Sequence, residues 1–323
     1  MIENYERIYK IFTPEAFSET MAVEEEGRRF AYYTTAETAK MVLENQELWL
    51  RNATVMNDFS EITYGLSLVE ETIYGEVGIE FRAAIDEIAS GTISTVEEII
   101  NQQADDWKLE TYFACISHHL KTENEAGRLS MWRAYGDTAI VINNGPLLAS
   151  TDLLGVFSTP VIYQSREKYE SQLIEVTASI RENREFLKSL GKDNLVLSIY
   201  CMCFFTAIAS KHPGFSEERE WRIFYRPNDK LLGTAIKPGA SLIKAETVVR
   251  NGIPQKIYKL PLKSIPEAGL HNADIPTLLD RIIIGPTRHP YVTVKAFEDI
   301  LEKLGVQNIG DKIVVSDIPL RID

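Results

Sequence analysis

The C-terminal part of the chain carries the pattern that most restricts its fold. Arg281–Ile284 is a short apolar run typical of a buried strand, Val292–Leu304 has apolar residues at helical spacing, and Lys312–Ser316 is a second strand pattern. Strand, helix and strand in this order predict a right-handed crossover, which needs a parallel strand pair with the helix packed against the sheet. We therefore expect a sheet covered by helices.

The rest of the chain alternates between strand and helix patterns, so the predicted class is α+β (mixed α/β). A capping-box pair, Thr34 with Glu37, predicts a helix start, and Ser94 with Glu97 predicts another. Further helices are expected from Val77 to near Gly91, from Tyr169 to Gly191, and over Asn194–Ser210. The predicted strands are Phe30–Thr34, Leu48–Leu50, Tyr112–Ser117, Ala139–Ile142, Trp221–Tyr225 and Lys256–Leu262.

Composition narrows the class of protein. The 323 residues are 45% apolar and carry a net charge of -13, which argues against a general nucleic-acid coat but allows a local basic groove. The longest apolar run, Leu195–Ala209, is too short for a membrane span, and no signal peptide is recognisable, so we expect a cytoplasmic protein without a membrane partner. Three cysteines fit reduced thiols, and no metal-site spacing or Gly-rich phosphate loop occurs.

The segment Glu218–Phe224 is the first candidate site. If it is extended, Glu218, Glu220 and Arg222 share one face and Trp221 faces the other way. Two carboxylates near a guanidinium could hold ribose hydroxyls or stabilise positive charge that develops on a sugar carbon. The alternative interpretation is a solvated strand face with ordinary salt bridges.

Two aromatic segments are further candidates. Trp132 and Tyr135 lie in the sequence LSMWRAYG just before a strand, where they would either stack on a heteroaromatic ligand or pack as core side chains. Tyr32, Tyr33 and Thr34 lie where a strand ends and a helix begins, which suits a ribose or a phosphate. A plain helix cap with flanking strand aromatics explains the same residues.

Several short motifs occur in a fixed order along most of the chain. They are AYYTT, LWLRN, MNDFSE, CIS, WRAYG, KHPGFSEEREWRIFY, IIIGP and IPLR. The ordered set resembles an uncharacterised bacterial family that often occurs near mobile elements and defence loci, and that family is distantly similar to ADP-ribosyltransferases, including DarT-type toxins. The resemblance implies a single elaborated domain over residues 1–323 with an ADP-ribosyltransferase-like split sheet and helical insertions, an N-terminal extension at 1–27, and a β-α-β element at 281–323.

The resemblance also implies roles for the candidate residues. Glu220 matches the catalytic glutamate, which would bind the nicotinamide ribose of NAD, and Glu218 matches the first carboxylate of an E-x-E turn. Tyr32 stands where the family usually has histidine, so it would meet the adenosine-side ribose as a neutral phenol, and Thr34 would support it. Further NAD contacts are expected from Tyr33, Trp132, Tyr135 and Arg222.

The implied activity is NAD-dependent ADP-ribosyl transfer to a macromolecule, either nucleic acid or protein, by a toxin or phage-defence effector. NAD is then a co-substrate, no metal is needed, and an antitoxin or defence-system protein is a possible partner. An NAD glycohydrolase, a non-catalytic nucleotide- or partner-binding module of the same fold, and a metal-dependent nuclease using Asp58, Glu61 and Glu220 remain alternatives.

Overall fold

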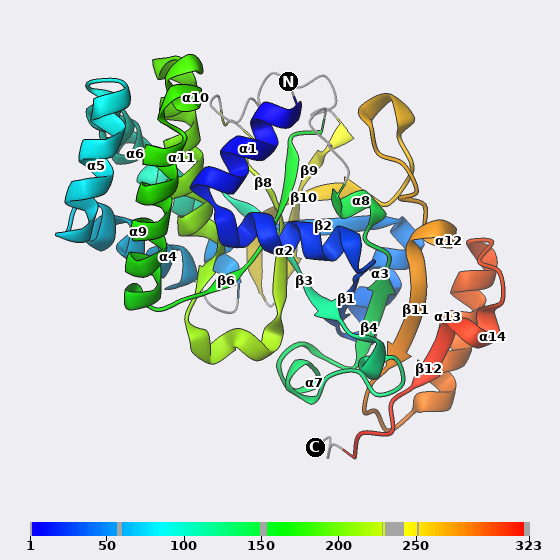
Figure 1. The fold of residues 1–323 in the computed structure, drawn as a ribbon. Coiled ribbons are helices and arrows are strands. Elements are labelled where there is room, and N and C mark those ends of the chain that lie inside the picture. The colour runs from blue at the N-terminus through cyan, green and yellow to red at the C-terminus, as the bar shows by residue number, and fades with distance from the viewer. Residues whose placement is uncertain are drawn as a thin grey trace. The chain divides into compact units, whose positions relative to one another are not determined.

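A computed structural model describes residues 2–56, 60–148, 154–227, 229, 242–250 and 252–319 (Figure 1). It consists of two compact units, and each is assembled from three separate segments of the chain. The helical unit comprises Met1–Met21, Asn52–Thr111 and Thr159–Ser216. The sheet unit comprises Ala22–Arg51, Tyr112–Ser158 and Glu217–Asp323.

The helical unit is built mainly from long helices. They are α1 (Ile2–Phe12), α2 (Pro14–Glu25, whose start belongs here), α4 (Ser60–Ile73), α5 (Val77–Ile88), α6 (Thr92–Leu109), α9 (Arg166–Glu182), α10 (Arg184–Ser189) and α11 (Lys192–Ala209). A short 3-10 helix, η1 (Ala53–Val55), and a parallel pair of short strands, β6 (Ile162–Tyr163) and β7 (Ser210–Lys211), complete it.

Helix α11 forms the core of this unit. It is long and apolar enough to cross a membrane, yet 67% of it is buried among other helices. Trp107 of α6 is fully buried against it, with its ring 5.6 Å from Tyr200 and 5.3 Å from Phe204, and its Nε1 donates to the Tyr200 hydroxyl at 3.3 Å. A helix that is apolar on all sides can therefore pack against neighbours on most of its surface.

The sheet unit contains the main sheet, in the order β12-β11-β4-β1-β3-β2-β10-β9, with β8 paired to β3 and β5 paired to β8. These strands and the surrounding helices confirm the predicted α+β class. The strands are β1 (Arg29–Thr34), β2 (Glu47–Asn52), β3 (Tyr112–His119), β4 (Thr138–Ile142), β5 (Val156–Pro160), β8 (Glu220–Tyr225), β9 (Lys244–Arg250), β10 (Ile253–Pro261), β11 (Leu279–Ile284) and β12 (Ile313–Val315).

Short helices connect the strands of this unit. They are α3 (Ala36–Asn45), η2 (Lys121–Glu123), α7 (Leu129–Tyr135), α8 (Gly145–Leu148), η6 (Pro266–Ala268), α12 (Ile275–Leu278), α13 (Pro290–Lys303) and α14 (Ile309–Lys312), with η3 (Pro213–Glu218) preceding β8.

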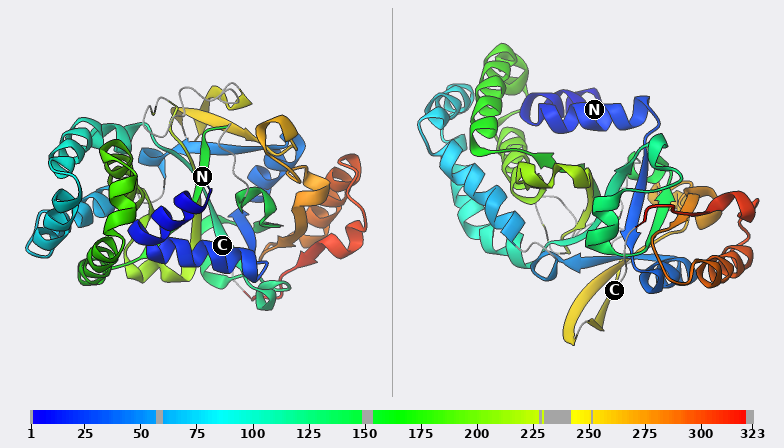
Figure 2. Two further views of the ribbon diagram at one scale, coloured as in Figure 1. Left: turned by 45° about the horizontal axis from the view of Figure 1, so that its top comes forward. Right: turned by 90° about the horizontal axis from the view of Figure 1, so that it is seen from below.

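The parallel strand pair and the intervening helix of the predicted C-terminal crossover are present. Strands β11 and β12 are parallel, with Ile282 paired to Ile313, and α13 connects them (Figure 2). Phe297 and Leu301 of α13 join Ile282, Ile284 and the apolar side chains of α3 in one buried cluster. The apolar residues that recur over 292–304 thus lie on one face of α13, and this face is buried against the sheet.

Several local predictions differ from the structure. Thr35, and not Thr34, caps α3, because its side chain accepts from the Thr38 amide. Helix α6 begins at Thr92, two residues before the predicted Ser94 start. The segment LSMWRAYG forms helix α7 up to Tyr135, and α1, α2 and β9 had no predicted counterpart. Residues 57–59 of the MNDFSE motif and residues 320–321 of the IPLR motif lie outside the described residues.

Gly136 follows α7 and brings the chain into close contact with the end of β1. It has a φ of 137°, and a Cβ placed there would lie 2.5 Å from the Thr34 carbonyl oxygen. We predict that Gly136→Ala lowers the free energy of unfolding by roughly 1–3 kcal/mol, because both the backbone and the close approach disfavour a side chain.

Urea unfolding of the two proteins measures this difference. Gly145→Ala is the matched control, because a Cβ at Gly145 meets no atom within 4 Å. Equal losses from the two substitutions would contradict the assignment of Gly136 to a glycine-specific close approach.

Candidate active site

The candidate residues lie near the point where strands β1 and β3 separate. The two strands are paired from Arg29 opposite His119 to Ala31 opposite Ser117, and β1 then continues beside β4 as far as Thr34. On its other edge β3 is paired with β8 along the whole of β8. Strand β1 thus leaves β3 beyond Ala31, while both strands remain part of one main sheet.

Glu220 is the first residue of β8 and is directly opposite Ser117 of β3. The preceding residue, Arg219, has a φ of 45°, a left-handed conformation that ends helix η3 and starts the strand. Arg222 follows two residues later on the same face, opposite Cys115. Glu220 and Arg222 thus share a face as predicted, whereas Glu218 lies in η3 and is not part of the strand.

Glu220 and Arg222 form a buried ion pair. The Arg222 Nε is 2.7 Å from the Glu220 Oε1, and the two residues are 1% and 8% exposed respectively. The Arg222 guanidinium also lies over the Phe113 ring at 5.2 Å from its centroid. All six residues of β8 are buried, so the alternative of a solvated, charge-alternating strand is wrong.

Because the pair is buried, each charged group is stabilised mainly by the other. Two charges taken out of water lose hydration, and only their mutual attraction and hydrogen bonds offset that loss. The Glu220 carboxylate is consequently held in one orientation by a short charge-assisted bond. A carboxylate fixed in a low-dielectric environment interacts with a nearby positive charge more strongly than one in water.

Glu218 lies beside the ion pair in sequence and is held by an aromatic side chain. The Tyr135 hydroxyl, at the end of α7, donates to the Glu218 Oε1 at 3.0 Å. The structure therefore brings Tyr135, Glu218, Glu220 and Arg222 into one region of the sheet unit. Each of these four residues was a candidate from the sequence.

Arg128 positions the backbone of this region and was not a candidate. Its guanidinium donates to the Ser117 hydroxyl at 2.7 Å, to the Glu218 carbonyl at 3.1 Å and to the His118 carbonyl at 2.6 Å. It also forms an ion pair with Glu123 at 2.8 Å. The only signal in the sequence was a single arginine that precedes a helix, which does not reveal that its guanidinium binds both the end of β3 and the residues before β8.

Tyr33 and Trp132 pack against each other in the core. Their rings are 4.8 Å apart in an edge arrangement, the Tyr33 hydroxyl accepts from the Arg128 amide at 3.0 Å, and the Trp132 Nε1 donates to the Ala126 carbonyl at 2.9 Å. Burial raises the pKa of Tyr33 to about 12. Both aromatic side chains have satisfied polar atoms, as core residues require.

Tyr32 and Glu220 lie on opposite faces of the sheet. Ala31 and Tyr33 share the face of Ser117 and Glu220, whereas Tyr32 packs with Ile140 and Ile142 against the α3 and α13 side. Burial raises the pKa of the Tyr32 phenol, and the Arg250 guanidinium opposes this shift. Thr34 is buried at the end of the same strand.

Residues 131–223 match the sequence model of a family described as Protein of unknown function (DUF2971). The match covers less than a third of the chain. It includes Trp132, Tyr135, Glu218, Glu220 and Arg222, and it excludes Tyr32, Tyr33 and Thr34. No curated protein and no solved structure matches the chain.

No cluster of three or more His, Cys, Asp or Glu side chains suited to a metal ion occurs among the described residues. Among the candidate nuclease ligands, Asp58 lies outside the described residues, and nothing is described for the Glu61 side chain.

The buried ion pair leads to a prediction about stability. Arg222→Met leaves Glu220 buried without its cationic partner, so we expect the free energy of unfolding to fall by about 3–5 kcal/mol. The double substitution Arg222→Met with Glu220→Leu removes both charges and should recover at least half of this loss. Chemical unfolding of the single and double variants measures the coupling; strictly additive losses would contradict it.

Two adjacent histidines at the end of β3 lead to a prediction about pH. Burial, followed by the Arg28 and Arg219 guanidinia, lowers the pKa of His118 to about 4, and burial also lowers that of His119 to about 4. The folded state thus binds these protons less readily than the unfolded chain, whose histidines titrate near 6.5. Their contribution to stability is complete above pH 6.5 and is lost as the pH falls towards 4.

Unfolding by urea at pH 7.5 and pH 5 checks this expectation, and the loss should be about 1 kcal/mol or more. His118→Phe is the test variant because His118 lies beside the Phe30 ring at 5.0 Å and the Trp221 ring at 6.5 Å. This variant should show a smaller loss between the two pH values. If the variant loses as much stability as the wild type between these pH values, His118 does not cause the loss.

Proposed function

We propose that the chain is an NAD-dependent ADP-ribosyltransferase in which the Glu220 carboxylate acts on the nicotinamide ribose. The observation that carries the proposal is the buried Glu220–Arg222 pair, in which the Nε and Oε1 atoms are 2.7 Å apart, near the point where β1 leaves β3. A preoriented carboxylate is what the cleavage of a glycosidic bond to a cationic leaving group requires.

The reaction breaks the bond between the ribose C1′ and the nicotinamide nitrogen. The electron pair of that bond leaves with the nicotinamide, which becomes neutral, and the positive charge develops on the ribose as an oxocarbenium-like species. A nucleophilic O–H or N–H of the acceptor then bonds to C1′ and releases its proton. The Glu220 carboxylate would stabilise the ribose charge, which exists mainly in the transition state.

The neighbouring groups have distinct roles in this proposal. Arg222 holds the Glu220 side chain in one orientation through the bond at 2.7 Å. Glu218, which accepts from the Tyr135 hydroxyl at 3.0 Å, would receive the proton of the acceptor as a general base. Arg128 fixes the Glu218 carbonyl and Ser117, so it is a positioning residue.

The acceptor in this proposal is a macromolecule, either protein or nucleic acid, and the biological role is that of a toxin or a phage-defence effector. If water takes the place of the acceptor, the same residues catalyse NAD hydrolysis. The two reactions share every step up to the attack on C1′, so only their products distinguish them.

One observation favours a second function, a non-catalytic nucleotide-binding module. Tyr32 and Glu220 lie on opposite faces of the sheet, so a ligand bound to Glu220 on the Ser117 face does not meet Tyr32 as the resemblance implied. A site that has lost this ribose contact could bind nucleotides without turnover.

Incubation of the purified protein with NAD labelled in the adenylate part tests the proposal. We expect release of nicotinamide together with labelled macromolecule or free ADP-ribose. Glu220→Gln should lower this rate by about 100-fold or more, because the substitution removes the charge that stabilises the transition state. Calorimetry with NAD and ADP-ribose distinguishes the enzyme from the binding module, because the binding module would bind these nucleotides without releasing nicotinamide.

Glu217→Gln is the matched control, because Glu217 is exposed in η3 and differs from Glu220 in its burial. This control should retain wild-type activity, and the thermal unfolding of both variants should be compared with that of the wild type. Absence of nicotinamide release by the wild type, or equal release by Glu220→Gln, would exclude Glu220 catalysis.

A further inference from the structure

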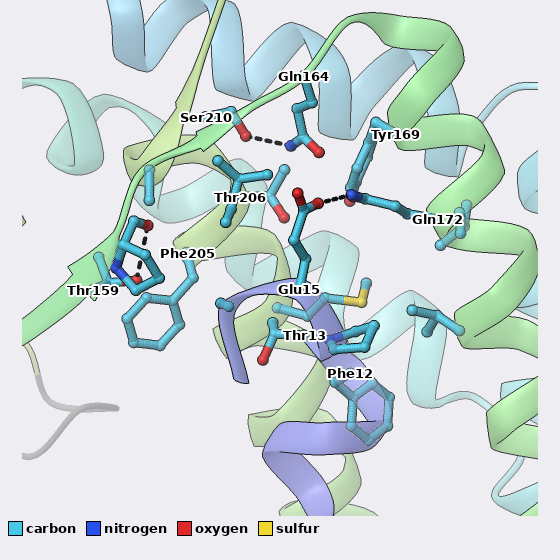
Figure 3. Close-up of a pocket in the computed structure, with 18 residues that line it drawn as sticks. Phe12, Thr13, Glu15, Thr159, Gln164, Tyr169, Gln172, Phe205, Thr206 and Ser210 are labelled. Carbon is cyan, nitrogen blue, oxygen red and sulfur yellow. Dashed lines mark hydrogen bonds between the residues drawn. The ribbon is translucent and has the colours of Figure 1, made fainter. Parts of the chain in front are cut away.

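The helical unit contains a small cavity that is separate from the candidate active site. It lies between the junction of α1 and α2, the start of α9 and the end of α11 (Figure 3). Its walls are mostly apolar and include Phe12, Leu173, Val176, Met202 and Phe205. The space is partly open to solvent, and the side chain of Glu15 in its lining is 36% exposed.

Gln164 presents an unpaired acceptor to this cavity. Its Nε2 donates to the Ser210 hydroxyl at 2.7 Å, which fixes the orientation of the amide, while its Oε1 is buried with no hydrogen-bond partner in the described part of the chain. The residue is 3% exposed. A buried carbonyl oxygen without a donor costs free energy, so the Oε1 has a strong preference for an N–H or O–H group in the cavity.

Two further polar side chains line the same space. The Tyr169 hydroxyl is buried near the Thr206 side chain, and Glu15 extends from the start of α2 toward Gln164 and Tyr169 (Figure 3). The Glu15 carboxylate accepts from the Gln172 amide and from the Lys168 ammonium, the latter at 2.6 Å. Carboxylate and amide oxygens thus supply acceptors on one side of the cavity, whereas the opposite walls are apolar.

The size of the cavity limits the ligand. Its volume of about 60 Å³ corresponds to about four to six water molecules, since each needs about 10–15 Å³ when volume is measured in this way. A molecule of about six to nine non-hydrogen atoms displaces that amount of water. The cavity is consequently too small for a dinucleotide and is not a second NAD site.

We propose that this cavity binds a small molecule that consists of a flat apolar body and a head group with at least two N–H donors, either an amide or an ammonium. The head group donates one N–H to the Gln164 Oε1 and a second toward the Glu15 carboxylate, and the apolar body packs against Phe12, Val176 and Phe205. A carboxylate head group is excluded because it has no N–H and would meet Glu15 with the same charge. This site goes beyond the proposed function and does not depend on it.

The test uses three probes of similar size on the full-length protein: benzamide, benzylamine and benzoate. We expect benzamide, benzylamine or both to bind with a Kd in the millimolar range, as suits a ligand of eight or nine non-hydrogen atoms, and benzoate to bind at least tenfold more weakly. Tighter binding of benzamide assigns a neutral amide head group, and tighter binding of benzylamine assigns an ammonium. Methyl NMR shifts of Leu173, Val176 and Met202 locate the bound probe.

Gln164→Leu removes the acceptor at nearly constant size and should weaken binding of the preferred probe at least tenfold. Gln102→Leu makes the same change on the exposed surface of α6 and should leave binding unchanged. If Gln164→Leu does not fold, Tyr169→Phe is used in its place, because it removes another polar group from the lining of the cavity. Failure of both nitrogen probes to bind the wild type, or equal binding by wild type and Gln164→Leu, would overturn the proposal.

Discussion

Strand β3 forms hydrogen bonds along both of its edges, and the organisation of the sheet unit depends on this pairing. Its last residues pair with β1, and its residues up to Ser117 pair with β8. Strand β2 is also a neighbour of β3 in the strand order of the sheet. Because successive side chains alternate between faces, the register of β3 decides which residues of β1 and β8 can meet. A shift by one residue would move Glu220 and Arg222 to the apolar face that contains Trp221 and Phe30.

The register also explains why charged residues are tolerated inside β8. Trp221, Ile223 and Tyr225 face a buried apolar cluster, while Glu220 and Arg222 face the other way and satisfy each other. Arg128 extends the same arrangement by hydrogen bonding to the backbone on both sides of the β3–β8 pair. Charge-assisted hydrogen bonds thus add to the apolar packing of the other face and favour a defined geometry for the Glu220 carboxylate.

The sequence predicted elements well where the periodicity was long and regular, as in α5, α11 and the β11-α13-β12 crossover. It also predicted the shared face of Glu220 and Arg222, because alternation is a local property of a strand. It did not predict that β8 is buried on both faces, since burial depends on which strands become its neighbours. The partners of Arg128 were unpredictable for the same reason: they come from β3, η2 and η3, and only tertiary pairing brings these segments together.

In the proposed reaction, the opposite placement of Tyr32 and Glu220 determines from which face of the sheet NAD would be held. A ligand at Glu220 lies on the face that also carries Ser117, Tyr33 and helix α7, so its contacts beyond the nicotinamide ribose come from that side. Tyr33 and Trp132 already use their polar atoms within the core, which leaves Tyr135, with its hydroxyl on Glu218, as the aromatic residue of α7 that is connected to the carboxylates. In this arrangement the pair of Tyr135 and Glu218, and not Tyr32, would complete the site around Glu220.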